Sequence, residues 1–401
     1  MKKAITEAGD LSGKRVLVRA DLSVPLHEGK ITDDTRLRVS LPTLEFLLVR
    51  RARVILCSHL DRPKGRVRND LRFDGVCGRL SDLLGVAVQK AEDCVGDEAR
   101  SAVERLQPGN VLLLENTRFH PGEESNDPAF ARQLADLADI FVNDAFACAH
   151  REHASTVGVA RLLPSYAGML MQQEMQSLTA LLQHPEHPYV AIMGGTKITD
   201  KLGAIEHLLP QVDTLLVGGT IASTLLKAKG VQVGASTVDR SALDDARRLI
   251  ELAGKKLVLP VDVMASTDVS THASAEMYPV EYMPLAVSIV DIGPETRALF
   301  RRKLEGAVTV VWNGPLGICE FKRFAQGTLD ILNKLAAMKA KVVVGGGDTT
   351  AVVQQAGKAE ALSHVSTGGA AFLRFLQGEE LPAIAALRDE RVEAVGIGSS
   401  S

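Results

Sequence analysis

Short apolar runs rich in β-branched residues recur along the chain, and each is stopped by a polar or glycine cluster and followed by a segment with helical spacing. The runs cover residues 16–18, 54–57, 111–114 and 140–142, and after a break 190–193, 214–217, 257–259, 288–290, 309–312 and 342–344. Strands that alternate with helices predict parallel sheets, because a βαβ crossover covers both faces of the sheet. The pattern therefore predicts an α/β protein.

The break between the two sets of runs predicts the domain organisation. Residues 165–182 have apolar positions at helical spacing and are followed by a turn that contains proline. At roughly 100 to 200 residues per domain, a chain of 401 residues holds two or three domains, and we expect two. We assign residues 1–165 to the first domain, 166–182 to a connector helix with a hinge, and 183–377 to the second domain.

Composition excludes several classes of partner. The formal net charge is −3 and aromatic residues make up 4% of the chain, so we expect no nucleic acid partner. Nowhere do 18 apolar residues run together, and the basic N-terminus lacks the apolar core of a signal peptide, so we expect no membrane. The five cysteines are scattered without paired spacing, which indicates reduced thiols in a cytoplasmic protein.

Arginines gather where the first set of strands ends. In open α/β sheets ligands bind beyond the carboxyl ends of the strands. The planar guanidinium fork matches carboxylate and phosphate oxygens, so several guanidiniums at one sheet edge predict a phosphorylated acid as ligand. A single such arginine would more simply be a solvated surface residue. The arginines at or near these ends are Arg19, Arg36, Arg62, Arg118 and Arg151.

At the ends of the second set of predicted strands, glycines stand where the first set has arginines. Residues 341–352 have the pattern of a buried strand, three glycines and then a helix, and glycine backbone can lie close to an anion at the helix N-terminus. Asp348 is placed where Mg²⁺ on a phosphate could use a carboxylate. Lys197 and Lys201, at i and i+4, are expected on one face of a helix start, within reach of phosphates. The alternative is a tight strand-to-helix connection with no ligand.

Several familiar site patterns do not occur. The chain has no G-x-x-x-x-G-K-[ST], no G-x-G-x-x-G and no G-x-S-x-G. P-loop, dinucleotide-binding and serine-hydrolase interpretations are therefore disfavoured. His150 and His153 have no carboxylate or cysteine partner at zinc-ligand spacing, which disfavours a zinc site.

Nine motifs, taken together and in order, make the chain resemble the phosphoglycerate kinase family over essentially its whole length. They are VRADLSVP, SHLDRP, LLENTRF, NDAFACAHREHAST, GGTKITDK, DIGPET, VVWNGPLG, VVGGGDTT and HVSTGG. The resemblance implies reversible phosphoryl transfer between 1,3-bisphosphoglycerate and ADP, giving 3-phosphoglycerate and ATP, by direct in-line transfer with domain closure. It implies a monomer of two Rossmann-like domains, with residues 378–401 packing back on the first. The final glycine and serine residues are expected to be disordered.

The resemblance also implies roles for particular residues. Arg36, Lys197, Gly346 and Gly347 would be catalytic, and Asp348 would serve Mg²⁺. The acid site would comprise Asp21, Ser23, Arg36, His59, Leu60, Asp61, Arg62, Arg118 and Arg151. The nucleotide site would comprise Lys197, Lys201, Asn313, Glu320, Gly346, Gly347, Asp348 and Thr349.

Departures from the family pattern cluster near the expected ligands. Serine stands at 23 in place of asparagine, and aspartate at 61 in place of glycine. Other departures lie at Ala147, Cys148, Thr196, Thr220, Ala370 and Arg374. A carboxylate at Asp61 predicts repulsion of an anionic substrate, unless the side chain turns outward. The departures leave open a second hypothesis, in which a weakened paralogue acts as a metabolite-binding or regulatory protein. A third hypothesis, an unrelated α/β binder of acidic metabolites, gives no reason for Lys197, Lys201 and the glycine turn.

Overall fold

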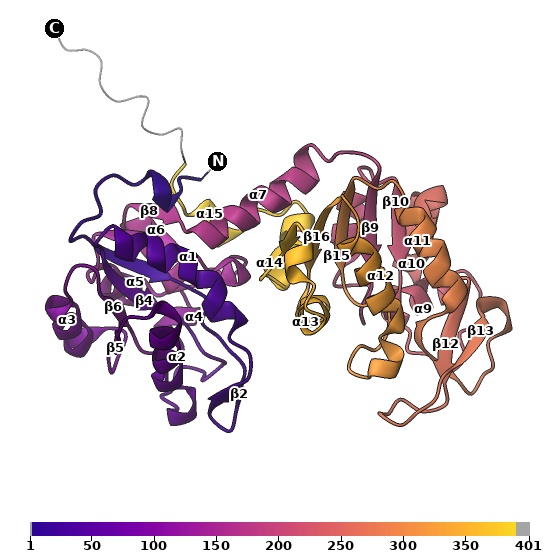
Figure 1. Ribbon diagram of the computed structural model, residues 1–401, viewed down its shortest axis with the longest axis horizontal. Coiled ribbons are helices and arrows are strands. Elements are labelled where there is room, and N and C mark those ends of the chain that lie inside the picture. The colour runs from indigo at the N-terminus through magenta and orange to yellow at the C-terminus, as the bar shows by residue number, and fades with distance from the viewer. Residues whose placement is uncertain (1, 390–401) are drawn as a thin grey trace, which may run out of the picture. The chain divides into compact units, whose positions relative to one another are not determined.

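The computed structural model describes residues 2–389 and divides the chain into two compact units (Figure 1). One unit contains the chain up to Met175 and the segment that begins at Glu380, and the other contains Gln176–Glu379. The tail for which we predict disorder lies outside the described residues. No helix among the described residues is long and apolar enough to cross a membrane.

The first unit is built on a six-stranded parallel sheet with strand order β5-β6-β4-β1-β7-β8. Five-residue strands β1 and β4 form its centre, and their near-complete burial explains why apolar runs predicted them. The strands are β1 (Arg15–Arg19), β4 (Arg53–Cys57), β5 (Val88–Lys90), β6 (Val111–Leu113), β7 (Ile140–Asn143) and β8 (Ser165–Ala167), with a separate hairpin β2 (Leu26–His27) and β3 (Lys30–Ile31). The helices are α1 (Thr35–Val49), α2 (Asp74–Leu84), α3 (Gly96–Arg105), α4 (Pro121–Glu124), α5 (Pro128–Ala135) and α6 (Val159–Leu162).

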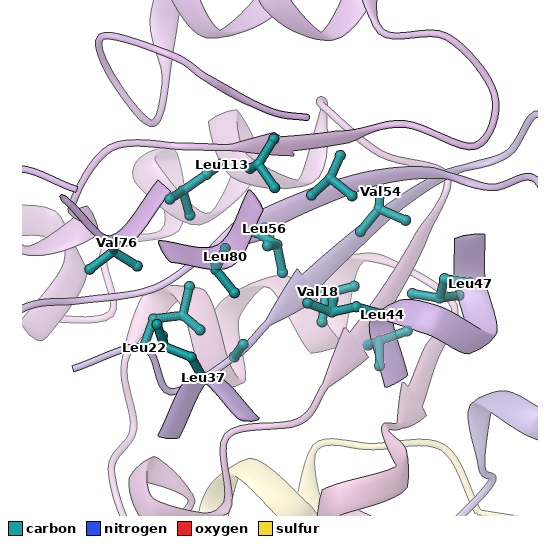
Figure 2. Close-up of a cluster of buried hydrophobic side chains, with 14 of the residues drawn as sticks. Val18, Leu22, Leu37, Leu44, Leu47, Val54, Leu56, Val76, Leu80 and Leu113 are labelled. Atoms are coloured by element: carbon teal, nitrogen blue, oxygen red, sulfur yellow. The ribbon is translucent and has the colours of Figure 1, made fainter. Parts of the chain in front are cut away.

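Helices α1 and α2 cover the sheet with branched aliphatic side chains (Figure 2). Leu44 and Leu47 of α1 and Leu80 of α2 are buried in one cluster with Val18 and Leu56 of the central strands. Each side chain of this kind stabilises the fold by about 1.5 to 3 kcal/mol on full burial. This packing fixes the sheet whose carboxyl edge carries the arginines.

The second unit contains a six-stranded parallel sheet, with order β11-β10-β9-β15-β16-β17, and a smaller antiparallel sheet, with order β13-β12-β14. The large sheet consists of β9 (Tyr189–Met193), β10 (Thr214–Val217), β11 (Leu257–Val258), β15 (Thr309–Asn313), β16 (Lys341–Gly345) and β17 (His364–Val365), and the small one of β12 (Asp262–Ser266), β13 (Glu276–Pro279) and β14 (Ser288–Ile292). The helices are α8 (Leu202–Leu208), α9 (Gly219–Ala228), α10 (Leu243–Ala253), α11 (Pro294–Leu304), α12 (Gln326–Ala336), α13 (Gly347–Gln355) and α14 (Ala370–Leu376).

One predicted strand of the second unit pairs differently from expectation. The run at 288–290 is a strand, as predicted, but β14 pairs antiparallel with β12 and does not join the parallel sheet. Its residues Ser288 and Ile289 are only partly buried, whereas strands of the parallel sheet such as β9 and β15 are buried throughout. A strand of this kind suits a sheet with one face toward solvent.

The segment predicted as a connector helix begins with a strand. Ser165–Ala167 pair with β7, and helix α7 (Met169–Gln183) follows. The helix starts at Met169 because its first amides have acceptors: Thr43 Oγ1 accepts from Met169 N at 2.9 Å, and Asp144 Oδ1 accepts from Met171 N at 3.1 Å. Near the chain end, short helix α15 (Pro382–Ala385) contacts the first unit, where Ala383 N donates to Ala149 O at 3.1 Å.

Candidate active site

In the first unit, the loop after β1 and the start of α1 bring together three predicted side chains. Arg36 Nη1 donates to Asp21 Oδ2 at 2.5 Å and to Ser23 Oγ at 2.6 Å, and Ser23 Oγ donates to Asp21 Oδ1 at 2.5 Å. The Arg36 side chain remains 43% exposed while that of Asp21 is 9% exposed. The carboxylate therefore orients the guanidinium from behind, and one side of the fork stays open to a ligand. Serine at position 23 supports this arrangement through its hydroxyl.

His59 and Arg118 form a second part of the same sheet edge. His59 follows β4 and is 6% exposed, and Arg118 lies in the short helix Thr117–Phe119 and is 3% exposed. Burial, and then the charges of Arg19, Arg118 and Arg151, hold the pKa of His59 well below its ordinary value. Burial and the charge of Arg151 lower the pKa of Arg118. The charges of these side chains thus oppose one another, and the lowered pKa of His59 favours its neutral form.

Not every predicted side chain joins this group. Leu60 is buried, and its backbone is tied on both sides to Asn116, whose Oδ1 accepts from Leu60 N at 3.2 Å and whose Nδ2 donates to Leu60 O at 2.9 Å. Arg62 is exposed, and none of the described residues forms a hydrogen bond or ion pair with it. Leu60 thus shapes the loop, while Arg62 is free to meet a ligand from solvent.

Asp61 has an unusual backbone for its residue type. Its φ is 53°, in the left-handed region that favours glycine, and its carbonyl accepts from Arg118 Nη1 at 2.7 Å. The side chain is exposed. The pKa of Arg68 is raised mainly by its hydrogen bond and charge interaction with Asp70, to which the charge of Asp61 adds least. The backbone of Asp61 therefore supports the site while its carboxylate is exposed to solvent.

Sequence reasoning missed the support behind this edge. Arg19, at the end of β1, is 1% exposed, and Glu123, at 0%, is also buried. Ser155 links the two: Arg19 Nε donates to Ser155 Oγ at 2.8 Å, and Ser155 Oγ donates to Glu123 Oε1 at 2.6 Å. Arg19 was one of several strand-end arginines, and no feature of the sequence distinguished a buried one from an exposed one.

In the second unit, the predicted turn from strand to helix is present between β16 and α13. Gly346 has φ of 99° and precedes the first residue of α13. A Cβ at this position would approach Asn313 Nδ2 to 2.8 Å, so glycine is required both by φ and by space. Asn313 Nδ2 donates to Gly345 O at 2.9 Å, and Thr349 Oγ1 accepts from Gly314 N at 2.7 Å. The buried side chains of Asn313 and Thr349 thus fix the backbone conformation of the turn.

The two predicted lysines do not share a helix face. Helix α8 begins only at Leu202, and residues 197–201 form a turn after β9, so the helical i,i+4 relation is wrong. Lys197 is exposed, whereas Lys201 is 9% exposed and its Nζ donates to Gly194 O at 2.5 Å and to Asn313 O at 3.2 Å. Burial lowers the pKa of Lys201 to about 8, opposed by the charges of Asp348 and Asp200. The glycine turn at Gly194 and Gly195, with φ of 93° at Gly195, delays the helix.

A cavity of about 360 Å³ lies beside this turn. It has the size of a small-molecule site, and its lining combines apolar side chains with a few polar groups. The predicted residues Glu320 and Asp348 line it, as do the departures Thr196 and Thr220. Lining residues that sequence reasoning missed are Ser223, Thr237, Ile289, Val290, Asp291, Cys319 and Gln355.

Asp291 is the most perturbed group of that lining. It is 1% exposed, and burial raises its pKa to about 7, although Gly327 N and Ile292 N both donate to its carboxylate. It lies in the DIGPET motif, for which the sequence predicted no role of its own. The carboxylate holds the start of α12 against the cavity wall, as its 2.7 Å bond to Gly327 N shows.

The comparisons with known proteins agree with the motifs. The family described as Phosphoglycerate kinase matches residues 5–379. A phosphoglycerate kinase of Pelotomaculum thermopropionicum is 50% identical over 97% of this chain and 100% of its own, and one of Moorella thermoacetica is also 50% identical, over 97% and 100%. The solved phosphoglycerate kinase of Coxiella burnetii superposes with a TM-score of 0.86 at 38% identity, covering 96% of this chain and 98% of its own. The chain belongs to the phosphoglycerate kinase family.

Proposed function

We propose that the two sheet edges hold the two substrates of the phosphoglycerate kinase reaction, in which a phosphoryl group passes between 1,3-bisphosphoglycerate and ADP to give 3-phosphoglycerate and ATP. The arginine edge of the first unit takes the acid, and the glycine turn and cavity of the second unit take the nucleotide. The observation that carries the proposal is the cluster at this sheet edge: Arg36 bonds to Asp21, and a carboxylate oxygen of Asp21 lies within 4.8 Å of a ring nitrogen of His59. The charges of Arg118 and Arg151 also act on His59. The names of the relatives favour the enzyme over the regulatory alternative.

The acid's carboxylate is already ionised, so transfer needs neither a protein nucleophile nor a general base. Catalysis then consists of in-line positioning and of neutralising charge on the transferred group. Arg36, oriented by Asp21 and Ser23, supplies charge from the first unit. Arg62, Arg118 and Arg151 hold the acid's oxygens, with Leu60 and Asp61 shaping the loop that places them. Reacting atoms must approach to about 3 to 3.5 Å, so we expect transfer to require closure of one unit on the other.

In the second unit, amides at the start of α13 point at the phosphates, with Gly346 and Gly347 allowing close approach. Lys197, which is exposed, supplies the catalytic charge, while Lys201 and Thr349 fix the turn and Glu320 lies at the cavity edge where a ribose would sit. Asp348 suits Mg²⁺, because it is an exposed carboxylate at the cavity and Mg²⁺ binds through one or two carboxylates plus substrate phosphates. When bound, Mg²⁺ neutralises phosphate charge. We further propose a cytoplasmic monomer.

A coupled assay with Mg-ATP and 3-phosphoglycerate tests the proposal. We expect turnover by the wild type, and loss of kcat in Lys197→Ala with both substrates still bound, because an interaction made in the transition state is removed. The matched control is Lys227→Ala, which removes a lysine from the last turn of α9. Wild-type activity no higher than that of Lys197→Ala, with both ligands bound, would overturn the catalytic hypothesis in favour of the regulatory one.

A further inference from the structure

The buried chain of hydrogen bonds behind the arginine edge fixes the position of every proton along it. Its members are Glu123, Ser155, Arg19 and His59, all at most 6% exposed. A guanidinium only donates hydrogen bonds and does not lose its proton in proteins. Each hydrogen-bond partner of Arg19 must therefore accept, and this constraint fixes the donor and acceptor roles of Ser155 on one side and of His59 on the other.

On one side the constraint reaches Glu123. Ser155 Oγ accepts from Arg19 Nε at 2.8 Å, so its own hydrogen is directed to Glu123 Oε1, 2.6 Å away. Ser155 N donates to the other oxygen, Glu123 Oε2, at 3.0 Å. A carboxylate that accepts at both oxygens fits an ionised Glu123, which balances the buried charge of Arg19.

On the other side the constraint reaches His59. Arg19 Nη2 lies 2.9 Å from His59 Nδ1, and because Nη2 donates, Nδ1 must present its lone pair. A neutral ring then carries its proton on Nε2. A charged ring would carry a proton on Nδ1 that faces the N–H of Arg19 Nη2. The contact between two donors therefore disfavours the imidazolium.

We propose that Arg19 is a positioning residue that holds His59 in one neutral tautomer, with the proton on Nε2 and the lone pair on Nδ1. The inference rests on the proposed function, in which His59 contacts the acid. Held in this form, His59 always offers a donor to an anionic oxygen. The opposite tautomer would offer a lone pair at Nε2, which repels an anion.

The surroundings of His59 act in the same direction. Its titratable and charged neighbours are Arg19 on β1, Arg118, Arg151 and His153, and Asp21 and Cys148 lie within 4.8 Å by their ligand atoms. The three arginines oppose a positive ring, and burial lowers the pKa of His153 to about 3, so that this side chain adds no charge near neutral pH. Asp21 is already engaged by Arg36 and Ser23.

Nitrogen NMR of protein labelled with ¹⁵N at histidine tests the tautomer directly. The His59 signals are assigned by their loss in His59→Gln, among ten histidines. We expect the wild type to show a neutral ring protonated at Nε2 from about pH 5.5 to about pH 8. A ring protonated at Nδ1, or one that titrates near the ordinary pKa of about 6.5, would overturn the proposal.

The double variant Arg19→Met with Glu123→Gln removes the donor without leaving an unpaired buried charge, which a single substitution would do. The amide introduced at position 123 can donate to Ser155 Oγ and accept from Ser155 N, so Ser155 keeps both partners and we expect the variant to fold. We expect the His59 ring of this variant to lose its single tautomer and to be protonated partly at Nδ1. At about pH 8 the KM for 3-phosphoglycerate should then rise roughly two- to tenfold, the value of one hydrogen bond. The KM for Mg-ATP stays the same.

Arg15→Met is the matched control, because it removes a half-buried arginine from the other end of β1 and should change neither the tautomer nor KM. A double variant that keeps the wild-type tautomer would refute the role of Arg19. If instead His59→Gln leaves the KM for the acid unchanged, His59 is not part of the acid site, and the proposed function fails at that residue while the NMR result still decides the tautomer.

Discussion

The buried ammonium of Lys201 predicts that nucleotide affinity weakens in alkaline solution. Burial lowers the pKa of this group to about 8 from the ordinary 10.5, so it loses its proton well before an exposed lysine does. Phosphate oxygens beside it favour the charged form and should return the pKa toward 10.5. Binding then takes up a proton, and affinity must fall as pH rises between the two pKa values.

The magnitude follows from those two pKa values. At about pH 7.5 most of the free protein already carries the proton, whereas at about pH 9.5 only a few per cent does. If the bound state has a pKa of 10.5, affinity weakens about twentyfold between these pH values, or ~2 kcal/mol. Near pH 9, close to one proton is taken up per nucleotide bound.

Isothermal titration of Mg-ADP at about pH 7.5 and about pH 9.5, in buffers of different ionisation enthalpy, measures the change in affinity and the number of protons taken up on binding. Lys201→Met should bind more weakly and lose the pH dependence. Lys197→Met, which changes the exposed lysine four residues earlier, should keep the pH dependence of the affinity. A wild-type affinity that is the same at both pH values, or an unchanged slope in Lys201→Met, would refute the reasoning.

Three further substitutions test other parts of the site. Asp348→Ala should weaken Mg-nucleotide binding several-fold and flatten the response of activity to Mg²⁺; an unchanged Mg²⁺ titration contradicts the metal role. Asp61→Gly should tighten the binding of 3-phosphoglycerate by about two- to fivefold, since a screened charge contributes up to ~1 kcal/mol, and should leave the affinity for Mg-ATP unchanged. Weaker binding of the acid by a stably folded variant argues against repulsion. Thr349→Val leaves the buried Gly314 N without its acceptor and should lower the free energy of unfolding by about 1 to 3 kcal/mol, measured by urea denaturation; an unchanged midpoint excludes that bond.

The strands that the sequence predicted share one property, burial. β1, β4, β9 and β15 are apolar almost throughout because both faces of a parallel sheet are covered. The missed strands are short edge strands such as β5 and β17, or members of the antiparallel sheet such as β13, whose residues Glu276–Pro279 are largely exposed. Their pairing depends on tertiary contacts, which no local pattern records.

The site was predictable where chemistry depends on local sequence. The glycine turn before α13 needs a positive φ at Gly346, and this requirement is visible as glycine. The burial of Arg19 and Lys201 was not visible, because Arg19 and Arg36, or Lys197 and Lys201, differ only in surroundings built from distant segments. Ser155 and Glu123 lie 136 and 32 positions from their respective partners Arg19 and Ser155.

The two units thus favour anions by different means, and the difference has a consequence for pH. The first unit relies on guanidiniums, which keep their charge throughout the accessible range, and on a histidine that its neighbours keep neutral. The second relies on backbone amides and on Lys201, which titrates at about pH 8. Between about pH 7.5 and about pH 9.5 the protein's groups therefore leave acid binding constant while nucleotide binding weakens. Steady-state KM values for the two substrates should separate over this interval, that for Mg-ATP rising and that for 3-phosphoglycerate staying level, and a parallel rise of both would place the titrating group outside the nucleotide site.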